Sequence, residues 1–179
     1  MSMSSMSSSS LSLASPYRFR AATSEDLAAI TDIYNASVVE GGATADLTPR
    51  TLEQRRRWVE SHRPPYGVFA VEAADGGVVA FGALSVFYDR AGYDGVTDLA
   101  YYIDPAWRGW GVGTFLLSHL LDEARDRGMR KAIGVIFADN AGSIALMRRF
   151  GFTRFGALPA AARDARGAMH DMSYWYLDL

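Results

Sequence analysis

The chain has 179 residues, of which 49% are hydrophobic and 21% are charged, and its formal net charge is −2. This length suits one domain with a well-buried core, and the composition is that of a globular protein. The nearly balanced charge provides no field to attract nucleic acid, and the lack of cysteine excludes disulfides, thiolate metal sites and an acyl-cysteine mechanism. The three histidines form no HExxH pair, so we expect no zinc site.

The first fifteen residues are almost entirely serine and methionine. They contain neither the positive n-region nor the apolar run of a signal peptide, and no segment has the roughly eighteen apolar residues of a membrane span. We therefore expect a disordered Ser-rich tail at residues 1–15, one domain at residues 16–179, no membrane partner and a cytoplasmic location. Met3 and Met6 leave open a start later than Met1, which N-terminal mass spectrometry of the native protein would decide.

The ordered part begins with a predicted strand and helix. Residues 17–20 alternate in polarity, as a half-buried strand does. Thr23 or Ser24 can cap a helix whose apolar residues recur at helical spacing up to Tyr34.

A second helix is predicted to start at Thr48-Pro49, a capping residue followed by proline at the first helical position. We interpret the arginine run at residues 55–57 on this helix as a solvated face. His62 stands at the helix end, where a partial positive charge suits the helix dipole.

Three strands follow the second helix. The apolar runs 68–73 and 78–87 are separated by Asp75-Gly76-Gly77, which is a strong hairpin signal. A loop at residues 88–95 leads to a third strand at residues 96–103.

The C-terminal half alternates helices and strands. A glycine-rich turn leads to a helix at residues 114–127, then a strand at 132–137 and a helix at 140–150, with glycines closing both helices. Strands at 152–157 and 172–177 flank a predicted loop at 159–169. The order β-α-α-β-β-β-α-β-α-β-β predicts an α/β (α+β) fold, with a mixed, mostly antiparallel central sheet flanked by helices.

Residues 108–114, Arg-Gly-Trp-Gly-Val-Gly-Thr, join a strand to a helix. Unpaired amides at such a helix N-terminus, together with the helix dipole, bind phosphate, and Arg108 adds a cation. A plain tight turn is the alternative. The spacing fails GxGxxG in both frames, although Asp139 could pass for a ribose-binding acid, and it is not a GxxxxGK[ST] P-loop. An Arg-x-x-Gly-x-Gly diphosphate clamp remains.

The segment Tyr102–Gly113 resembles motif A of the GNAT superfamily of acetyl-CoA N-acetyltransferases. The segment Asp139–Phe152, an Asn followed by a helix that ends in Gly-Phe, resembles the second cofactor segment of that superfamily. Tyr34-Asn35, Tyr93-Asp94 and the ending His170–Leu179 are similar to its phosphinothricin/methionine sulfoximine acetyltransferase branch. The resemblance covers residues 17–179 and implies a GNAT-like fold.

The resemblance implies acetyl-CoA as the co-substrate and no metal. Backbone groups of Tyr102 and Ile103 would pair with the pantetheine arm like an added strand. Asn140 would hydrogen-bond the cofactor, and Ser143 and Met147 would line the same groove, although helix packing explains these two equally well. The amides that would hold the diphosphate follow Arg108 and belong to Gly109, Trp110, Gly111, Val112, Gly113 and Thr114.

Acetyl transfer to an amine needs a base, and an α-amino group with a pKa near 8 needs only a modest one. Asp98 is the first candidate, since it lies roughly 16 Å along the strand before Ile103. The branch usually has Glu there, so a bridging water is an open alternative, as is a merely solvent-facing carboxylate. His170, whose ordinary pKa is near 6.5, is the second candidate because it matches the family's His-Asp ending; a structural role is the alternative.

The loop before the Asp98 strand carries the candidate substrate residues Tyr88, Arg90 and Tyr93. The guanidinium can bind a carboxylate or phosphinate, and an exposed loop without a ligand is the rival interpretation. Tyr102 shares a strand face with Asp98 and is expected to line the acceptor pocket. Trp107 and Trp110 are interpreted as packing around the glycine-rich turn.

The favoured function is acetyl-CoA-dependent N-acetyl transfer to a small amino-acid-like amine, of phosphinothricin or methionine sulfoximine type. The alternatives are another amine (a protein N-terminus, a polyamine or an aminoglycoside) or a non-catalytic acyl-CoA-binding module. Members of the family are commonly homodimers. The aromatic strand at residues 174–176 fits such an interface, and core packing explains it equally well.

Overall fold

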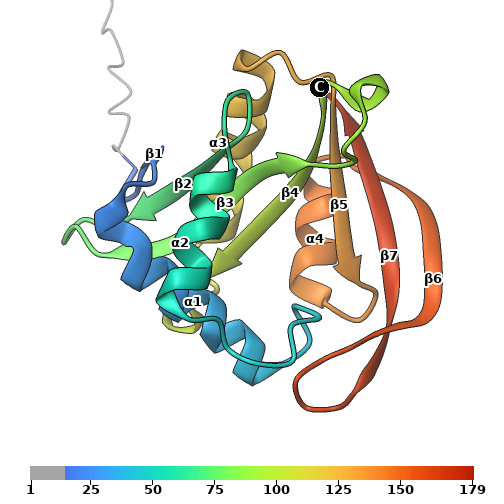
Figure 1. Ribbon diagram of the computed structural model, residues 1–179, viewed down its shortest axis with the longest axis horizontal. Coiled ribbons are helices and arrows are strands. Elements are labelled where there is room, and N and C mark those ends of the chain that lie inside the picture. The colour runs from blue at the N-terminus through green and yellow to red at the C-terminus, as the bar shows by residue number, and fades with distance from the viewer. Residues whose placement is uncertain (1–14) are drawn as a thin grey trace, which may run out of the picture.

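The computed structural model describes residues 15–179 (Figure 1), so the predicted tail lies outside the described residues except for Ser15. The elements follow one another in the predicted order, with three short 3-10 helices in addition. They are β1 (Arg18–Ala21), η1 (Ser24–Asp26), α1 (Leu27–Glu40), α2 (Leu52–Ser61), β2 (Gly67–Glu72), β3 (Val78–Val86), η2 (Ala91–Tyr93), β4 (Val96–Ile103), η3 (Pro105–Trp107), α3 (Val112–Asp126), β5 (Lys131–Phe137), α4 (Ala141–Arg149), β6 (Thr153–Arg163) and β7 (Met169–Asp178).

The strands form one seven-stranded sheet in the order β1-β2-β3-β4-β5-β7-β6. Every neighbouring pair is antiparallel except β4 and β5, which confirms the mixed, mostly antiparallel sheet that the sequence predicts. The parallel pair is short, since it joins only Val96–Asp98 to residues 131–133. Beyond Asp98 the two strands separate, and the remaining half of β4 has no partner on that edge among the described residues.

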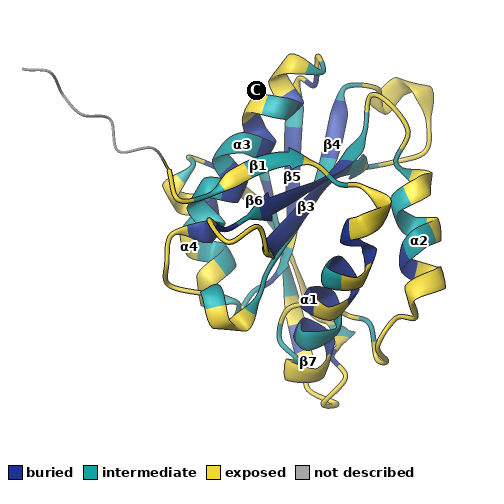
Figure 2. Cartoon of the chain, turned by 90° about the vertical axis from the view of Figure 1, so that its left-hand side faces the viewer, coloured by how far each residue is buried: buried dark blue, intermediate teal, exposed yellow. Residues whose placement is uncertain are grey.

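Helices cover both faces of the sheet (Figures 1 and 2). On one face, α1 packs Ile30, Ile33 and Val38 against β2 and β3. On the other face, α3 packs Leu116, Leu117 and Leu120, and α4 adds Met147. Burying these leucines contributes about 2 kcal/mol each from area alone. No helix between residues 15 and 179 combines the length and the apolar character needed to cross a membrane.

Both N-terminal helices start at local capping signals, but the N-cap of α2 is not the predicted Thr48. Thr23 forms a capping box with Asp26 at the start of η1, which leads directly into α1. Thr51, not Thr48, is the N-cap of α2: its hydroxyl accepts from the Gln54 amide, and the Gln54 side chain accepts from the Thr51 amide. This reciprocal pair satisfies two of the helix's free donors.

The arginine run on α2 is not a uniformly solvated face. Arg55 is buried, and its guanidinium lies 3.9 Å from the centre of the Tyr34 ring and 4.7 Å from that of Trp58. A guanidinium stacks on aromatic faces where its charge is attracted by the ring quadrupole. Arg57 remains exposed and pairs with Glu53, so the helix turns only one arginine of the run inward.

His62 is neutral rather than partly positive. Its Nδ1 lies 2.6 Å from the carbonyl oxygen of Trp58, which can only accept, so Nδ1 carries the proton. Its Nε2 then accepts from the Ser85 hydroxyl at 2.8 Å. Burial lowers the pKa of His62, because it disfavours the charged ring.

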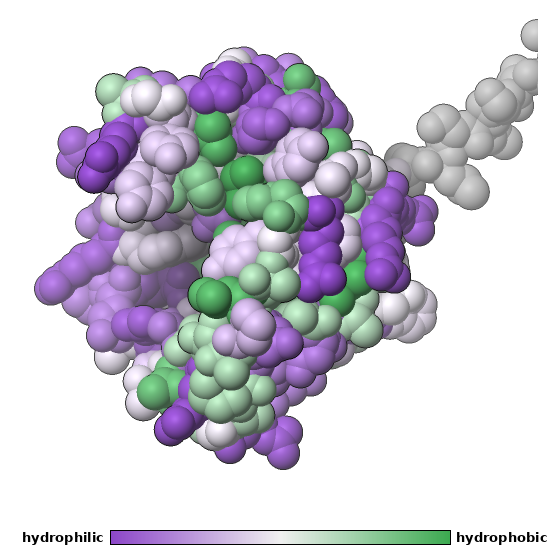
Figure 3. Space-filling model, turned by 90° about the vertical axis from the view of Figure 1, so that its right-hand side faces the viewer, coloured by the Kyte–Doolittle hydropathy of each residue, from purple (hydrophilic) through white to green (hydrophobic). Residues whose placement is uncertain are grey.

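The C-terminal hairpin is longer than predicted. Residues 159–163 continue β6 instead of forming a loop, and only residues 164–168 make the turn. The register of β6 against β7 shifts between Leu158 and Ala162. Such a bulge interrupts the alternation of inward and outward side chains by which a strand is recognised in a sequence. Trp175 is buried in the core, so packing explains this part of the aromatic strand. Figure 3 shows the β6 side of the molecule, where hydrophobic and hydrophilic side chains are mixed on the surface. Phe155 and Leu158 of β6 are among the exposed hydrophobic residues.

The sheet and α3 pack closely at Gly82. A Cβ there would lie 2.5 Å from Leu120 Cδ1 and 3.0 Å from the Ala100 carbonyl oxygen. We predict that Gly82→Ala lowers the free energy of unfolding by about 1–3 kcal/mol, because the added methyl group overpacks this contact. Gly92→Ala is the control, since a Cβ at Gly92 meets nothing within 4 Å. Equal urea-unfolding midpoints for the two variants would contradict the prediction.

Candidate active site

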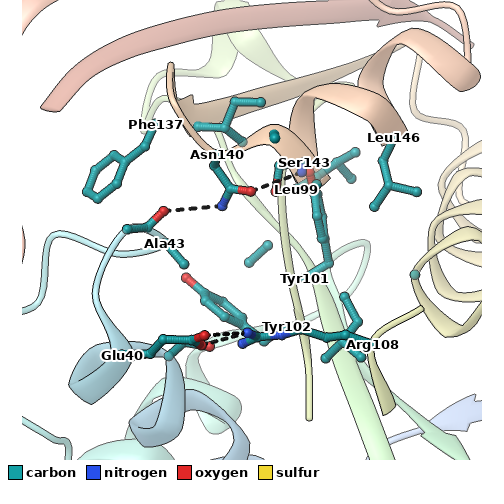
Figure 4. A pocket seen from close by; sticks show the side chains of 18 of the residues that line it. Glu40, Ala43, Leu99, Tyr101, Tyr102, Arg108, Phe137, Asn140, Ser143 and Leu146 are labelled. Carbon is teal, nitrogen blue, oxygen red and sulfur yellow. Dashed lines mark hydrogen bonds and ion pairs between the residues drawn. The ribbon is translucent and has the colours of Figure 1, made fainter. Parts of the chain in front are cut away.

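A cleft of about 720 Å³ opens where β4 and β5 separate. Its walls come from β4, the glycine-rich turn with the start of α3, the end of β5, the start of α4 and the loop after α1 (Figure 4). The predicted site residues that line it are Asp98, Tyr102, Ile103, Arg108, Gly109, Gly111, Gly113, Thr114, Asn140 and Ser143. The fold thus brings most of the predicted site into one cavity.

The glycine-rich turn presents its backbone to this cleft. Gly109 and Gly111 both adopt a φ of +81°, which side chains other than glycine rarely tolerate, and a Cβ at either would meet nothing within 4 Å. The amides of residues 109–114 make no hydrogen bond outside α3 within the described chain. Open space beside free amides and a helix N-terminus suits an anion.

Two residues of this turn have side chains that take no part in the cleft. Trp110 is 71% exposed, so the expectation that it packs around the turn was wrong. Val112 is buried in the core and is absent from the cleft lining. Only their main-chain amides can serve the anion site.

Arg108 lines the cleft, but its charge already has a partner. Its Nη1 lies 2.6 and 2.7 Å from the two carboxylate oxygens of Glu40, at the end of α1 (Figure 4). Both side chains are exposed, so this ion pair contributes at most about 1 kcal/mol and can exchange for another anion.

Asp98 is a half-buried carboxyl group that faces the cleft. Its Oδ1 is buried without a hydrogen-bond partner among residues 15–179. Burial raises the pKa of Asp98 to about 7, because the carboxylate loses hydration that the protein does not replace. A carboxyl group with this pKa exchanges protons readily near neutral pH.

His170 does not line the cleft, and both its ring nitrogens are engaged. Nδ1 lies 2.8 Å from an Asp139 oxygen, and Nε2 lies 3.1 Å from an Asp164 oxygen. Burial alone lowers the pKa of His170, but the bonds to Asp164 and Asp139 outweigh it and the net pKa is raised. Both ring nitrogens face carboxylates instead of the cleft, so the geometry does not support His170 as the base.

Two residues predicted to serve the cofactor, Asn140 and Met147, have structural roles at α4. Asn140 caps α4 by accepting from the Ser143 amide at 3.0 Å, and its Nδ2 donates to the Gly42 carbonyl at 3.3 Å. One Nδ2 hydrogen and one Oδ1 lone pair have no partner among the described residues, so the implied cofactor bond stays a prediction. Met147 is fully buried and absent from the cleft lining, and its sulfur fills the space beside Gly134. Core packing, rather than groove lining, accounts for Met147.

Tyr88, Arg90 and Tyr93 lie on the exposed β3–β4 loop and are absent from the cleft lining. The Tyr88 and Tyr93 rings pack together at 5.3 Å, and the Arg90 guanidinium lies 5.9 Å from the centre of the Tyr88 ring. These three predicted substrate residues therefore pack against one another and do not line the cleft.

Sequence reasoning missed one wall of the cleft. The Glu40–Ala43 segment after α1 lines the cavity, as do Tyr101 and Asp139. The Gly41-Gly42 pair is typical of a helix end. No sequence signal near this pair predicts that the turn lies beside α4. The Tyr101 hydroxyl is buried and has no hydrogen-bond partner in the described part of the chain.

Comparisons with known proteins find similar chains over most of this sequence. Residues 27–152 match the acetyltransferase (GNAT) family model. The L-methionine sulfoximine/L-methionine sulfone acetyltransferase of Salmonella typhimurium is 34% identical over 89% of this chain and 93% of its own. The acetyl-CoA complex of a phosphinothricin acetyltransferase from Sinorhizobium meliloti has a TM-score of 0.85 at 30% identity, over 92% and 89% of the chains. A ribosomal-protein-alanine N-acetyltransferase from Brucella melitensis has a TM-score of 0.86 at 34% identity, over 90% and 99%.

The raised pKa of Asp98 predicts an effect on stability. Between the ordinary pKa of 3.8 and about 7, the folded state binds more protons at this group than the unfolded state, so the stability falls as the pH rises. Asp98→Asn should therefore be more stable than the wild type at pH 8, by about 2–4 kcal/mol, and equally stable near pH 4. Urea unfolding at both pH values measures this. Asp94→Asn, which removes an exposed carboxylate nearby, is the control. A stability difference independent of pH would contradict the prediction.

Proposed function

The chain belongs to the acetyltransferase (GNAT) family, whose enzymes use acetyl-CoA, and we propose that it acetylates the amine of a small amino-acid-like molecule. Methionine sulfoximine and phosphinothricin are the acceptors of choice, because relatives named for them are similar over most of both chains. The observation that carries the proposal is the Asp98 carboxyl group, with its pKa of about 7, in the same cleft as the free amides of the glycine-rich turn.

The residues of the cleft fit acetyl-CoA. The amides of Gly109–Thr114 at the start of α3 would hold the diphosphate, with Arg108 exchanging Glu40 for it. The free edge of β4 at Tyr102 and Ile103 would pair with the amide groups of the pantetheine arm. When bound, acetyl-CoA supplies an acetyl group activated as a thioester.

The amine must be neutral to attack, and Asp98 is the group that takes its proton. At pH 7 about half of the Asp98 side chains are ionised, because their pKa is about 7. The cleft needs no enzyme nucleophile, since the neutral amine would attack the thioester carbonyl directly. The C–N bond would form as the C–S bond breaks, and CoA would leave as a thiolate that takes up a proton. Tyr102 stacks on Phe81 at 5.3 Å and lines the cleft, so it forms a rigid wall for the acceptor on the strand face that it shares with Asp98.

An amino-acid acceptor needs a cation for its carboxylate, and Arg90 is the proposed ligand. The register supports this assignment: Val86, the last residue of β3, pairs with Thr97, the neighbour of Asp98. The loop that carries Arg90 therefore begins beside the proposed base. In the structure, Arg90 lies outside the cleft lining, so the loop must fold inward over the acceptor.

A peptide N-terminus is the second candidate acceptor. The similarity to a ribosomal-protein-alanine N-acetyltransferase favours it. A protein N-terminus and a free amino acid present the same α-amino group, but only the amino acid carries a carboxylate on the adjacent carbon.

The test is an assay of CoA release with a panel of amines. We predict the highest kcat/KM for methionine sulfoximine or phosphinothricin, and rates at least about tenfold lower for alanyl peptides, polyamines and aminoglycosides. Arg90→Gln should raise the KM for an amino acid and leave that for its carboxamide unchanged. A preference for the peptides would favour the second acceptor. Tight acetyl-CoA binding by calorimetry without turnover on any amine would favour a binding module.

Asp98 gives a second prediction for catalysis. Asp98→Asn should lower kcat by roughly 10²–10⁴, because the amine loses its proton acceptor. The Kd for acetyl-CoA should stay within about threefold of that of the wild type, since the clamp lies at the other end of β4. The wild-type rate should rise with pH through about 7, as Asp98 ionises. Unchanged turnover in the variant would remove Asp98 from the mechanism.

A further inference from the structure

Asp164 joins two distant parts of the chain. This side chain is 4% exposed and lies in the turn between β6 and β7. Its Oδ1 accepts from the amides of Arg166 and Ala168 at 2.9 and 3.0 Å, within its own turn. Its Oδ2 accepts from the Gly42 amide at 3.1 Å and lies 3.1 Å from His170 Nε2. One carboxylate thus holds both its own turn and the segment after α1.

The segment after α1 is shaped to receive this carboxylate. Gly41 has a φ of +79°, and a Cβ there would lie 2.5 Å from Asp164 Oδ2, so only glycine fits. Two further bonds hold the same segment: Arg166 Nη1 donates to the Glu40 carbonyl at 3.3 Å, and Asn140 Nδ2 donates to the Gly42 carbonyl at 3.3 Å. The contacts converge on residues 40–42 from the β6–β7 turn and from α4.

This segment faces the acceptor side of the cleft. Gly41, Gly42 and Ala43 line the cavity, and Ala43 faces Asn140 and Tyr102 in Figure 4. The next residue, Thr44, is 3.0 Å from the Tyr34 hydroxyl, and the Tyr34 ring packs edge-on against Tyr102. Tyr102 shares its strand face with Asp98, so the segment lies on the face of β4 toward which the proposed base points.

We propose that Asp164 and His170 are positioning residues, which hold residues 41–43 as the acceptor-side wall of the cleft and so set the affinity for the amine. The proposal rests on the proposed function, because it concerns the acceptor of that reaction. It assigns neither residue a part in proton transfer.

The protonation state of His170 follows from its partners. Asp139 from the end of β5 and Asp164 from the β6–β7 turn each face one ring nitrogen, and only the charged ring can donate to both. Phe137 stacks on the ring at 4.4 Å, and the guanidinium of Arg166 bonds to the nearby Glu40 carbonyl. As the pH rises through the raised pKa of His170, the ring loses one donor, and its hold on one of the two carboxylates weakens.

Asp164→Asn tests the proposal selectively. The amide oxygen of asparagine can still accept from Arg166 and Ala168, but its NH2 group cannot accept from Gly42. We expect the KM for the amine to rise about tenfold, with kcat and the Kd for acetyl-CoA each within about threefold of the wild type. His170→Gln should raise the same KM, and the increase should shrink as the pH rises, because the wild type then loses the same contact.

Asp171→Asn is the matched control, since this exposed carboxylate accepts from the Ala160 amide within the same hairpin. It should leave the KM unchanged. An unchanged KM in Asp164→Asn would overturn the proposal, and a loss of kcat at constant KM in His170→Gln would place His170 in proton transfer instead.

Hydrogen–deuterium exchange measures how firmly residues 41–43 are held, and it needs no acceptor amine. Deuterium uptake by the peptide that covers residues 41–44 should be faster in Asp164→Asn than in Asp171→Asn. Equal uptake would overturn the proposal even if the acceptor class is right. Faster uptake without acetylation of any amino acid would mean that the wall is held as proposed and that the proposed function has failed.

Discussion

The separation of β4 from β5 is the constraint on which the rest of the site depends. The two strands pair over only three residues, at Val96–Asp98. Because β5 continues alongside β7, the later half of β4 keeps a free edge, and the turn that follows opens directly onto the cleft. A fully paired sheet would leave neither a free edge for an extended ligand nor room above the first turn of α3.

The same separation sets the chemistry of Asp98. This residue belongs to the last pair before the strands diverge, so its carboxyl group lies at the inner end of the cleft. There it loses hydration without gaining a partner for Oδ1, which raises its pKa to about 7. The charged form is thus costly to the fold, and it is the form that the proposed reaction requires. The buried leucines of α3 and the aromatic packing around Arg55 support a fold that carries this cost.

The C-terminal hairpin lies beyond the residues that match the family model, and it holds one wall of the cleft through Asp164. Asp164 accepts from the Gly42 amide in the segment after α1, more than a hundred residues earlier in the chain, and His170 bonds to Asp164. Under the proposed function, the glycine-rich turn and β4 serve the cofactor, while the loop after α1 and the hairpin shape the acceptor side. The same proposal gives the histidine of the His-Asp ending a positioning role rather than one in proton transfer.

The sequence alone determined the order of the elements and the glycine-rich turn, because capping residues, alternation and glycine spacing are local signals. It also led to Asp98, since distance along a strand is set by backbone geometry. Only the tertiary structure decided which side chains are turned inward. Arg55 is buried, Met147 fills the core, and His170 lies between two carboxylates. Each outcome depends on a partner from a distant segment, and no local pattern specifies how distant segments meet.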